Sequence, residues 1–192
     1  MTLPVAPPFR EAAPEQTVKV LIQDERRQVL LVQERGKPQD TTEPDGSGQW
    51  AKPPGWGAPG GKVEGTEDDI VRGIHEQFRR LRMDPKSITV RRALKRCREL
   101  GDPRVTLTAV KEVLEEAGIF IAPFALDLWK RRREETIWLV RARPAIVGHA
   151  GPGDVHIIRA SWHPATNLPE NTYRRTRAMV RRAVLRPEGG RA

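Results

Sequence analysis

The stretch KEVLEEAGI, residues 111–119, combines three glutamates with an apolar helical face. Glu112, Glu115 and Glu116 are spaced i, i+3 and i+4, so a helix places them on one face. Like charges at these spacings destabilise a helix by a few tenths of a kcal/mol per pair, and a divalent cation would compensate for them. A solvated acidic helix face is the alternative interpretation. The opposite face, with Leu107, Val110, Leu114 and Ala117, is expected to pack on a core.

Outward from this helix, the chain alternates between strand-like and helix-like segments. A β-hairpin is predicted at 17–36 and a long loop at 37–57. Helices are predicted at 67–81, 86–100 and 102–116, strands at 119–130, 135–144 and 155–164, and a terminal amphipathic helix at 169–186. This order predicts an α/β domain in which helices pack on a mixed sheet.

The composition limits the class of protein. The 192 residues suit a single domain, and the formal net charge of +9 favours an anionic partner, unless it only reflects an arginine-rich solvated surface. The single cysteine, Cys97, excludes an internal disulfide and fits a reducing cytoplasm. No apolar run reaches the roughly 20 residues of a membrane helix. We expect residues 1–16 to be a flexible arm without secretory character and residues 17–192 to be the domain.

A second stretch, GGKVEGTE at residues 60–67, combines with KEVLEEAGI into a known pattern. Together they resemble the two halves of the Nudix hydrolase box. Two departures stand out, since Lys111 replaces the family's arginine, and 43 residues separate Glu67 from Lys111 where the family has seven. The resemblance therefore implies a Nudix-like α/β/α sandwich with a mixed β-sheet and a helical hairpin inserted at about residues 68–103.

The resemblance also implies a metal site. It assigns Mg²⁺, or Mn²⁺ in its place, to Glu112, Glu115, Glu116 and the carbonyl of Gly60. Lys111 would orient Glu112, and Glu67 would support the site or assist proton removal from water. Glycines here let the backbone approach metal and phosphate without a Cβ clash. The general base is left open among Glu115, Glu116, Glu134 and Glu135.

Substrate contacts are predicted around the glycines. Gly60, Gly61 and Lys62 belong to them, and Trp50 and Trp56 are candidates for stacking on a base, with a packed core aromatic as the alternative for each tryptophan. His156 and His163 have no partner at metal-ligand spacing, so we interpret them as structural or exposed.

The implied activity is that of a Nudix-type nucleotide pyrophosphohydrolase, a metal-dependent enzyme that cuts a phosphoanhydride bond in a nucleoside diphosphate derivative. Basic residues gather at 68–104 and 171–192, which raises dinucleoside polyphosphates or the 5′ end of RNA as alternative substrates. A catalytically inactive regulatory module that binds nucleotide or RNA is the other alternative. The expected partners are a nucleotide substrate, with RNA or a second copy of the chain as further candidates, and no membrane.

Overall fold

The computed structural model describes residues 16–38, 50–82, 84, 88–99, 102–122, 125–132, 135–141, 147–148 and 156–185. The predicted arm at residues 1–16 therefore lies almost wholly outside the described residues. The helices are α1 (Glu67–Arg80), α2 (Ile88–Glu99), α3 (Pro103–Ala117) and α4 (Arg174–Ala183). The strands are β1 (Thr17–Gln23), β2 (Gln28–Glu34), β3 (Lys37–Pro38), β4 (Trp50–Lys52), β5 (Gly55–Gly57), β6 (Ile119–Phe120), β7 (Leu126–Arg132), β8 (Glu135–Arg141), β9 (Val147–Gly148) and β10 (Ile157–Pro164).

The main sheet is mixed and has the order β10-β2-β1-β8-β7, with β5 added beside β2. The predicted hairpin is confirmed, because β1 and β2 are antiparallel and join at a turn in which Asp24 Oδ1 accepts the Gln28 N–H at 2.7 Å. β7 and β8 form the predicted antiparallel pair, while β8 runs parallel to β1.

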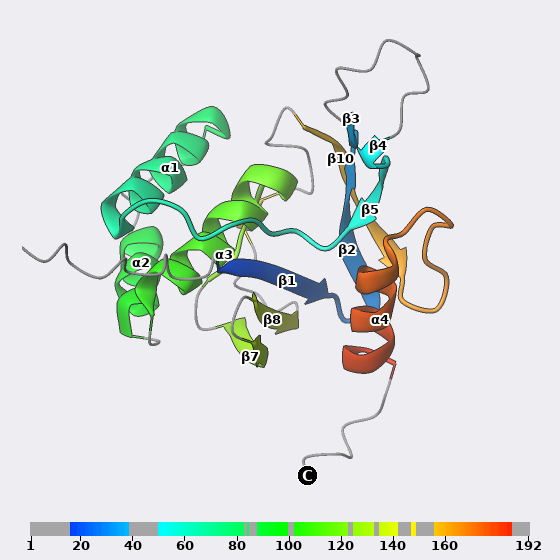
Figure 1. Cartoon of the computed structure of the whole chain (residues 1–192). Helices are drawn as coiled ribbons and strands as arrows, with labels where there is room; N and C mark the ends of the chain where they lie inside the picture. Colours follow the sequence, from blue (N-terminus) through cyan, green and yellow to red (C-terminus); the bar gives the residue numbers. More distant parts are fainter. Residues whose placement is uncertain are drawn as a thin grey trace, which may run out of the picture.

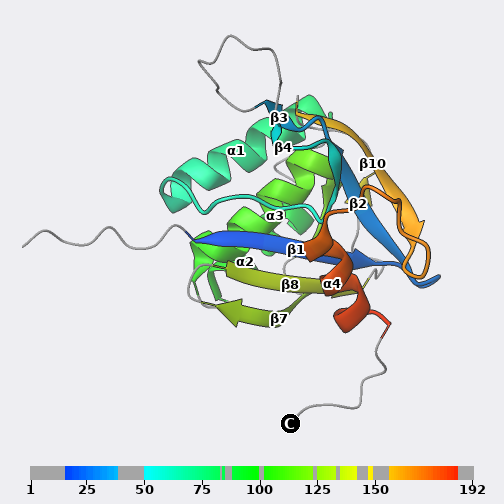
Figure 2. The same ribbon diagram turned by 45° about the vertical axis from the view of Figure 1, so that its right-hand side comes forward.

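The sheet divides between β1 and β2. These strands pair only near the turn, at Ile22–Leu30 and Gln23–Val29, and β2 then continues beside β10 while β1 continues beside β8 (Figure 2). Residues 58–61, which we call the glycine loop, pair with the freed edge of β1. The N–H groups of Val18 and Val20 donate to the carbonyls of Gly61 and Pro59 at 2.8 and 2.9 Å. The loop therefore serves as a substitute for a strand beside β1.

Helices cover both faces of the sheet, as Figure 1 shows, so the predicted α/β/α sandwich is confirmed. Strand alternation creates the two faces, because successive side chains point to opposite sides. Val18, Val20 and Ile22 of β1 join the core beneath α1 and α3. Leu21 points the other way, into the core beneath α4 with Met179 and others.

The inserted stretch contains two helices, as predicted, and both α1 and α2 pack against α3. α1 begins with a capping box between Thr66 and Asp69. α3 begins at the cap Asp102 followed by Pro103 and ends at Gly118, whose φ of 67° is left-handed. None of the helices in the described part of the chain is long and apolar enough to cross a membrane.

Candidate active site

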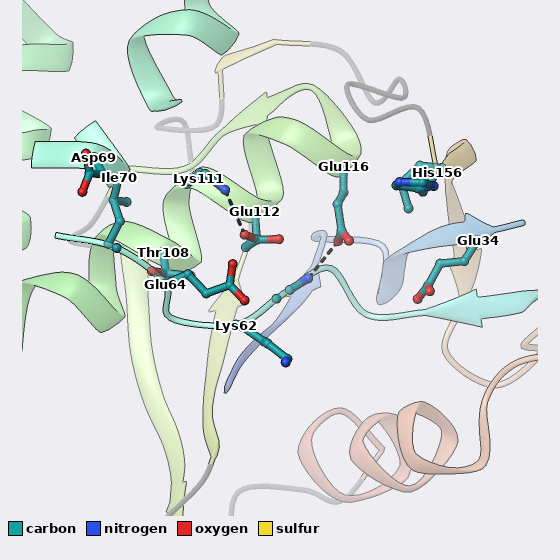
Figure 3. A pocket seen from close by; sticks show the side chains of 14 residues that line it. Glu34, Lys62, Glu64, Asp69, Ile70, Thr108, Lys111, Glu112, Glu116 and His156 are labelled. Atoms are coloured by element: carbon teal, nitrogen blue, oxygen red, sulfur yellow. Dashed lines mark hydrogen bonds and ion pairs between the residues drawn. The ribbon is translucent and has the colours of Figure 1, made fainter. Parts of the chain in front are cut away.

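A pocket of about 730 Å³ opens where α3 meets the glycine loop. Figure 3 shows the carboxylates of Glu112 and Glu116 extending from α3 toward the loop, with Glu34 across the pocket. The described lining consists of Glu34, Gly60, Gly61, Lys62, Glu64, Gly65, Asp69, Ile70, Thr108, Lys111, Glu112, Glu116, His156 and Ile157.

Glu116 is tied directly to the glycine loop. The Gly60 N–H donates to Glu116 Oε2 at 2.8 Å, which joins two segments 56 residues apart. Burial raises the pKa of the Glu116 carboxyl to about 8, although the nearby charge of Lys19 acts against this rise. A carboxylate in such surroundings is stabilised by a cation.

Glu112 lies beside the same loop and is held by Lys111. Lys111 Nζ donates to Glu112 Oε1 at 3.2 Å, and the Glu112 side chain is only 14% exposed. Burial raises the pKa of Glu112, with the charge of Lys111 opposing it. A Cβ at Gly61 would lie 2.4 Å from Glu112 Oε2, so only glycine leaves the carboxylate in its observed place.

Glu115 points away from the pocket, toward α1. Its Oε2 accepts from Lys111 Nζ at 2.8 Å and its Oε1 accepts from Gln77 Nε2 at 3.4 Å. Burial acts to lower the pKa of Lys111, but Glu112 and Glu115 outweigh burial and raise it. Glu115 is not among the described pocket-lining residues, and neither is Glu67, the first residue of α1. The structure therefore does not bring these two predicted site residues into the pocket.

The Gly60 carbonyl, a predicted metal ligand, already has a partner. Lys19 Nζ donates to this oxygen at 3.0 Å and to the Ala58 carbonyl at 3.1 Å. An ion at the Gly60 oxygen would therefore have to compete with an ammonium group.

The predicted substrate contacts divide into two groups. Gly60, Gly61 and Lys62 line the pocket. The stacking role of Trp56 was wrong, because its side chain is 3% exposed and packs in the core beneath α4, edge-to-face with His163 at 4.6 Å between ring centroids. Trp50 begins β4, but its side chain lies outside the described part of the structure.

Two candidates for the general base can also be placed. Glu135 is buried outside the pocket and forms an ion pair with Arg175 of α4, so it cannot reach a water there. Glu134 lies outside the described residues.

Sequence reasoning missed several pocket residues, namely Glu34, Glu64, Gly65, Asp69, Ile70, Thr108, His156 and Ile157. Thr108 precedes Glu112 by four residues, so helical spacing alone places it on the same face. His156 is exposed, which was one of the two predicted alternatives, and it lines the pocket just before β10. No local signal marks Glu34, which the fold brings in from the end of β2.

The donor set fits a hard divalent cation. No three histidine, cysteine, aspartate or glutamate side chains in the described ranges are arranged to hold a metal as they stand. Mg²⁺, however, is commonly bound by one or two carboxylates, with waters and substrate phosphates completing its coordination. Glu112 and Glu116 can supply the two carboxylates. The buried Thr108 Oγ1, which has no hydrogen-bond partner among the described residues, adds an unsatisfied oxygen to the pocket lining.

Comparisons with known proteins identify the fold. No family model and no curated protein matches the sequence. Among solved structures, the MutT NUDIX hydrolase from Burkholderia pseudomallei covers 88% of this chain and 98% of its own, with 15% identity and a TM-score of 0.51. The chain has the Nudix fold.

Two further similar structures have TM-scores below 0.5, so the fold assignment does not depend on them. A NUDIX hydrolase from Nitrosomonas europaea aligns over 92% of this chain and 73% of its own, at 13% identity and a TM-score of 0.46. An ADP-ribose pyrophosphatase from Streptococcus suis aligns over 92% and 95%, at 17% identity and a TM-score of 0.41.

Proposed function

We propose that the chain is a hydrolase, dependent on Mg²⁺ or Mn²⁺, that cleaves a phosphoanhydride bond in a nucleoside diphosphate derivative. One observation carries this proposal. Glu112 and Glu116 of α3 meet Gly60 and Gly61 at a large pocket, although about 50 residues and two helices separate the segments. The Nudix fold of the chain supports the same chemistry.

The pocket suits a phosphorylated ligand of nucleotide size. Small-molecule sites usually measure about 300–1,000 Å³, and this pocket has about 730 Å³. Acidic residues outnumber lysines in its described lining, which disfavours a bare polyphosphate and favours one that arrives with divalent cations. Apart from His156, the described lining contains no aromatic ring, so base stacking is not the main source of affinity in that part of the pocket.

Each side chain then has a definite task. Glu112 and Glu116 would hold the cation, which on binding supplies charge neutralisation at phosphate and a more acidic water. Lys111 positions Glu112, and the Gly60 N–H positions Glu116. The general base must reach the attacking water from within the pocket. Besides the two cation-binding groups, the described carboxylates that line it are Glu34, Glu64 and Asp69.

The test is a substrate panel with Mg²⁺ or Mn²⁺. Nucleoside triphosphates, nucleoside diphosphate sugars, dinucleoside polyphosphates and 5′-triphosphorylated RNA are assayed for release of phosphate, pyrophosphate or nucleoside monophosphate. We expect Glu112→Gln and Glu116→Gln to lower kcat/KM by about a hundredfold or more. Glu76→Gln, an exposed glutamate on α1, serves as the matched control and should leave turnover unchanged.

Absence of turnover by the native chain on every substrate would refute the enzyme proposal and favour the inactive binding module. Cleavage confined to RNA or dinucleoside polyphosphates would instead select the alternative substrates. RNA binding, self-association and a cytoplasmic location remain predictions from the sequence.

A further inference from the structure

Four consecutive carbonyls of the glycine loop all accept hydrogen bonds from three consecutive residues of β1. The carbonyls of Pro59 and Gly61 accept from the backbone N–H groups of Val20 and Val18. The carbonyls of Ala58 and Gly60 accept from the side chain of Lys19, at 3.1 and 3.0 Å. Backbone groups alone satisfy every second carbonyl, and Lys19 satisfies the others.

Lys19 can do this because of its place in the strand. It lies between Val18 and Val20, whose side chains enter the core beneath α1 and α3, so it leaves β1 on the opposite side. The loop also lies tightly against it. A Cβ at Gly60 would approach Lys19 Cα to 2.9 Å and Lys19 Cδ to 3.0 Å. The aliphatic part of the Lys19 side chain is thus packed against Gly60.

The same ammonium acts electrostatically on the two carboxylates of the site. Its charge opposes the rise that burial causes in the pKa of Glu116 and in the pKa of Glu112. Gly60 is held through both of its backbone groups, because its N–H donates to Glu116 and its carbonyl accepts from Lys19.

We propose that Lys19 is a tethered cation, which holds the glycine loop in place before metal binding and competes with the divalent cation for the Gly60 carbonyl. This inference rests on the proposed function for its second part only. The cost of competition is a weaker affinity for the divalent ion, and the gain is a loop that is already ordered when the ion and its nucleotide arrive. Lys19 is accordingly a positioning residue.

The test uses the full chain and two neutral variants. Lys19→Met removes the charge and the donors while keeping a similar length, and Lys19→Gln keeps a donor for one carbonyl. Lys19→Arg keeps the charge. Lys95→Met, which removes an exposed lysine on α2, controls for net charge. Thermal unfolding is measured in EDTA, and Mn²⁺ affinity is measured from the electron paramagnetic resonance signal of free Mn²⁺.

We expect both neutral variants to bind Mn²⁺ about five- to tenfold more tightly than the native chain, the size of a modest coupling between two sites. In EDTA their Tm should fall by roughly 5 °C, and saturating Mn²⁺ should narrow this difference. Lys19→Arg and Lys95→Met should behave like the native chain in Mn²⁺ affinity.

Unchanged or weaker Mn²⁺ binding in the neutral variants would overturn the competition, and an unchanged Tm in EDTA would overturn the loop-holding role. If Lys19→Met fails to fold, Lys19→Gln decides the question of affinity. If the native chain binds no Mn²⁺ at all, the proposed metal-dependent function fails, while the comparison in EDTA still tests Lys19 on its own.

Discussion

Two adjacent glycines allow stability and function to be separated by single substitutions. Gly60 has a φ of +148°, and a Cβ there would lie 2.2 Å from the Val18 carbonyl oxygen. Gly61 has no positive φ, and a Cβ there would meet the end of the Glu112 side chain at 2.4 Å. Alanine at the first position therefore conflicts with the backbone of β1, and alanine at the second conflicts only with a movable carboxylate.

The magnitudes follow from these contacts. Gly60→Ala combines an unfavourable φ with a backbone clash, so we expect a loss of about 2–5 kcal/mol in unfolding free energy. At about 2–4 °C per kcal/mol for a chain of this size, Tm should fall by roughly 5–20 °C. In Gly61→Ala, the carboxylate must retreat by about 1 Å to restore an ordinary contact of about 3.4 Å. We expect a displacement of that size to lower kcat/KM by about a hundredfold, while Tm should move by less than about 3 °C.

The assay compares calorimetric Tm, Mn²⁺ affinity and turnover for the two variants and the native chain. Destabilisation of Gly61→Ala as strong as that of Gly60→Ala would contradict the contrast between the two positions. Native Mn²⁺ affinity and native turnover in Gly61→Ala would contradict it as well, because Glu112 would then not need its observed position.

Two other substitutions test the framework around the site. Burial lowers the pKa of His163, with Arg159 adding to the effect, so the neutral ring is favoured on folding. The contribution of the neutral His163 ring to folding stability is complete above the ordinary pKa of 6.5. It is lost as pH falls from 6.5 through the lower pKa of the folded state. His163→Phe should flatten the dependence of the urea midpoint on pH below 6.5, and an equally steep decline would contradict this assignment. Asp102→Ala removes the cap of α3, whose Oδ1 accepts the Arg104 N–H at 3.0 Å, and should cost about 1 kcal/mol. Mn²⁺ affinity should stay the same in this variant, because the capped end of α3 lies more than about two helical turns from Glu112. A large loss of affinity would contradict this and show that the whole helix moves.

The sequence predicted those parts of the fold that depend on local chemistry. The two ends of α3 could be predicted because capping and left-handed geometry are properties of single residues. α3 begins at Asp102 and Pro103 and ends at Gly118. The apolar spacing of α3 also identified its buried face, since Leu107, Val110, Leu114 and Ala117 are all buried. The meeting of α3 with the glycine loop was inferred from a resemblance to a known box, and the hydrogen bond between Gly60 and Glu116 agrees with it.

The direction of individual side chains could not be predicted, because it depends on partners distant in sequence. Glu115 shares a helical face with Glu112 and Glu116, but Gln77 of the inserted α1 and Lys111 hold it away from the pocket. Trp56 lies in residues 37–57, which were predicted to be a long loop, but the structure forms β3, β4 and β5 in this stretch. Pairing of β5 with β2 places Trp56 in the core. The role of Lys19 could not be predicted either, because its carbonyl partners lie 39 and 41 residues further on.

The pairing of the glycine loop with β1 bears on how a ligand enters and leaves. Lifting the loop would break the hydrogen bonds of Val18 and Val20 and fray the central strand, so this wall of the pocket is expected to stay closed during turnover. Gating motions should instead arise in the walls built by α1 and the start of β10. Amide hydrogen exchange at Val18 and Val20 should accordingly be as slow as in the rest of the core, with or without nucleotide.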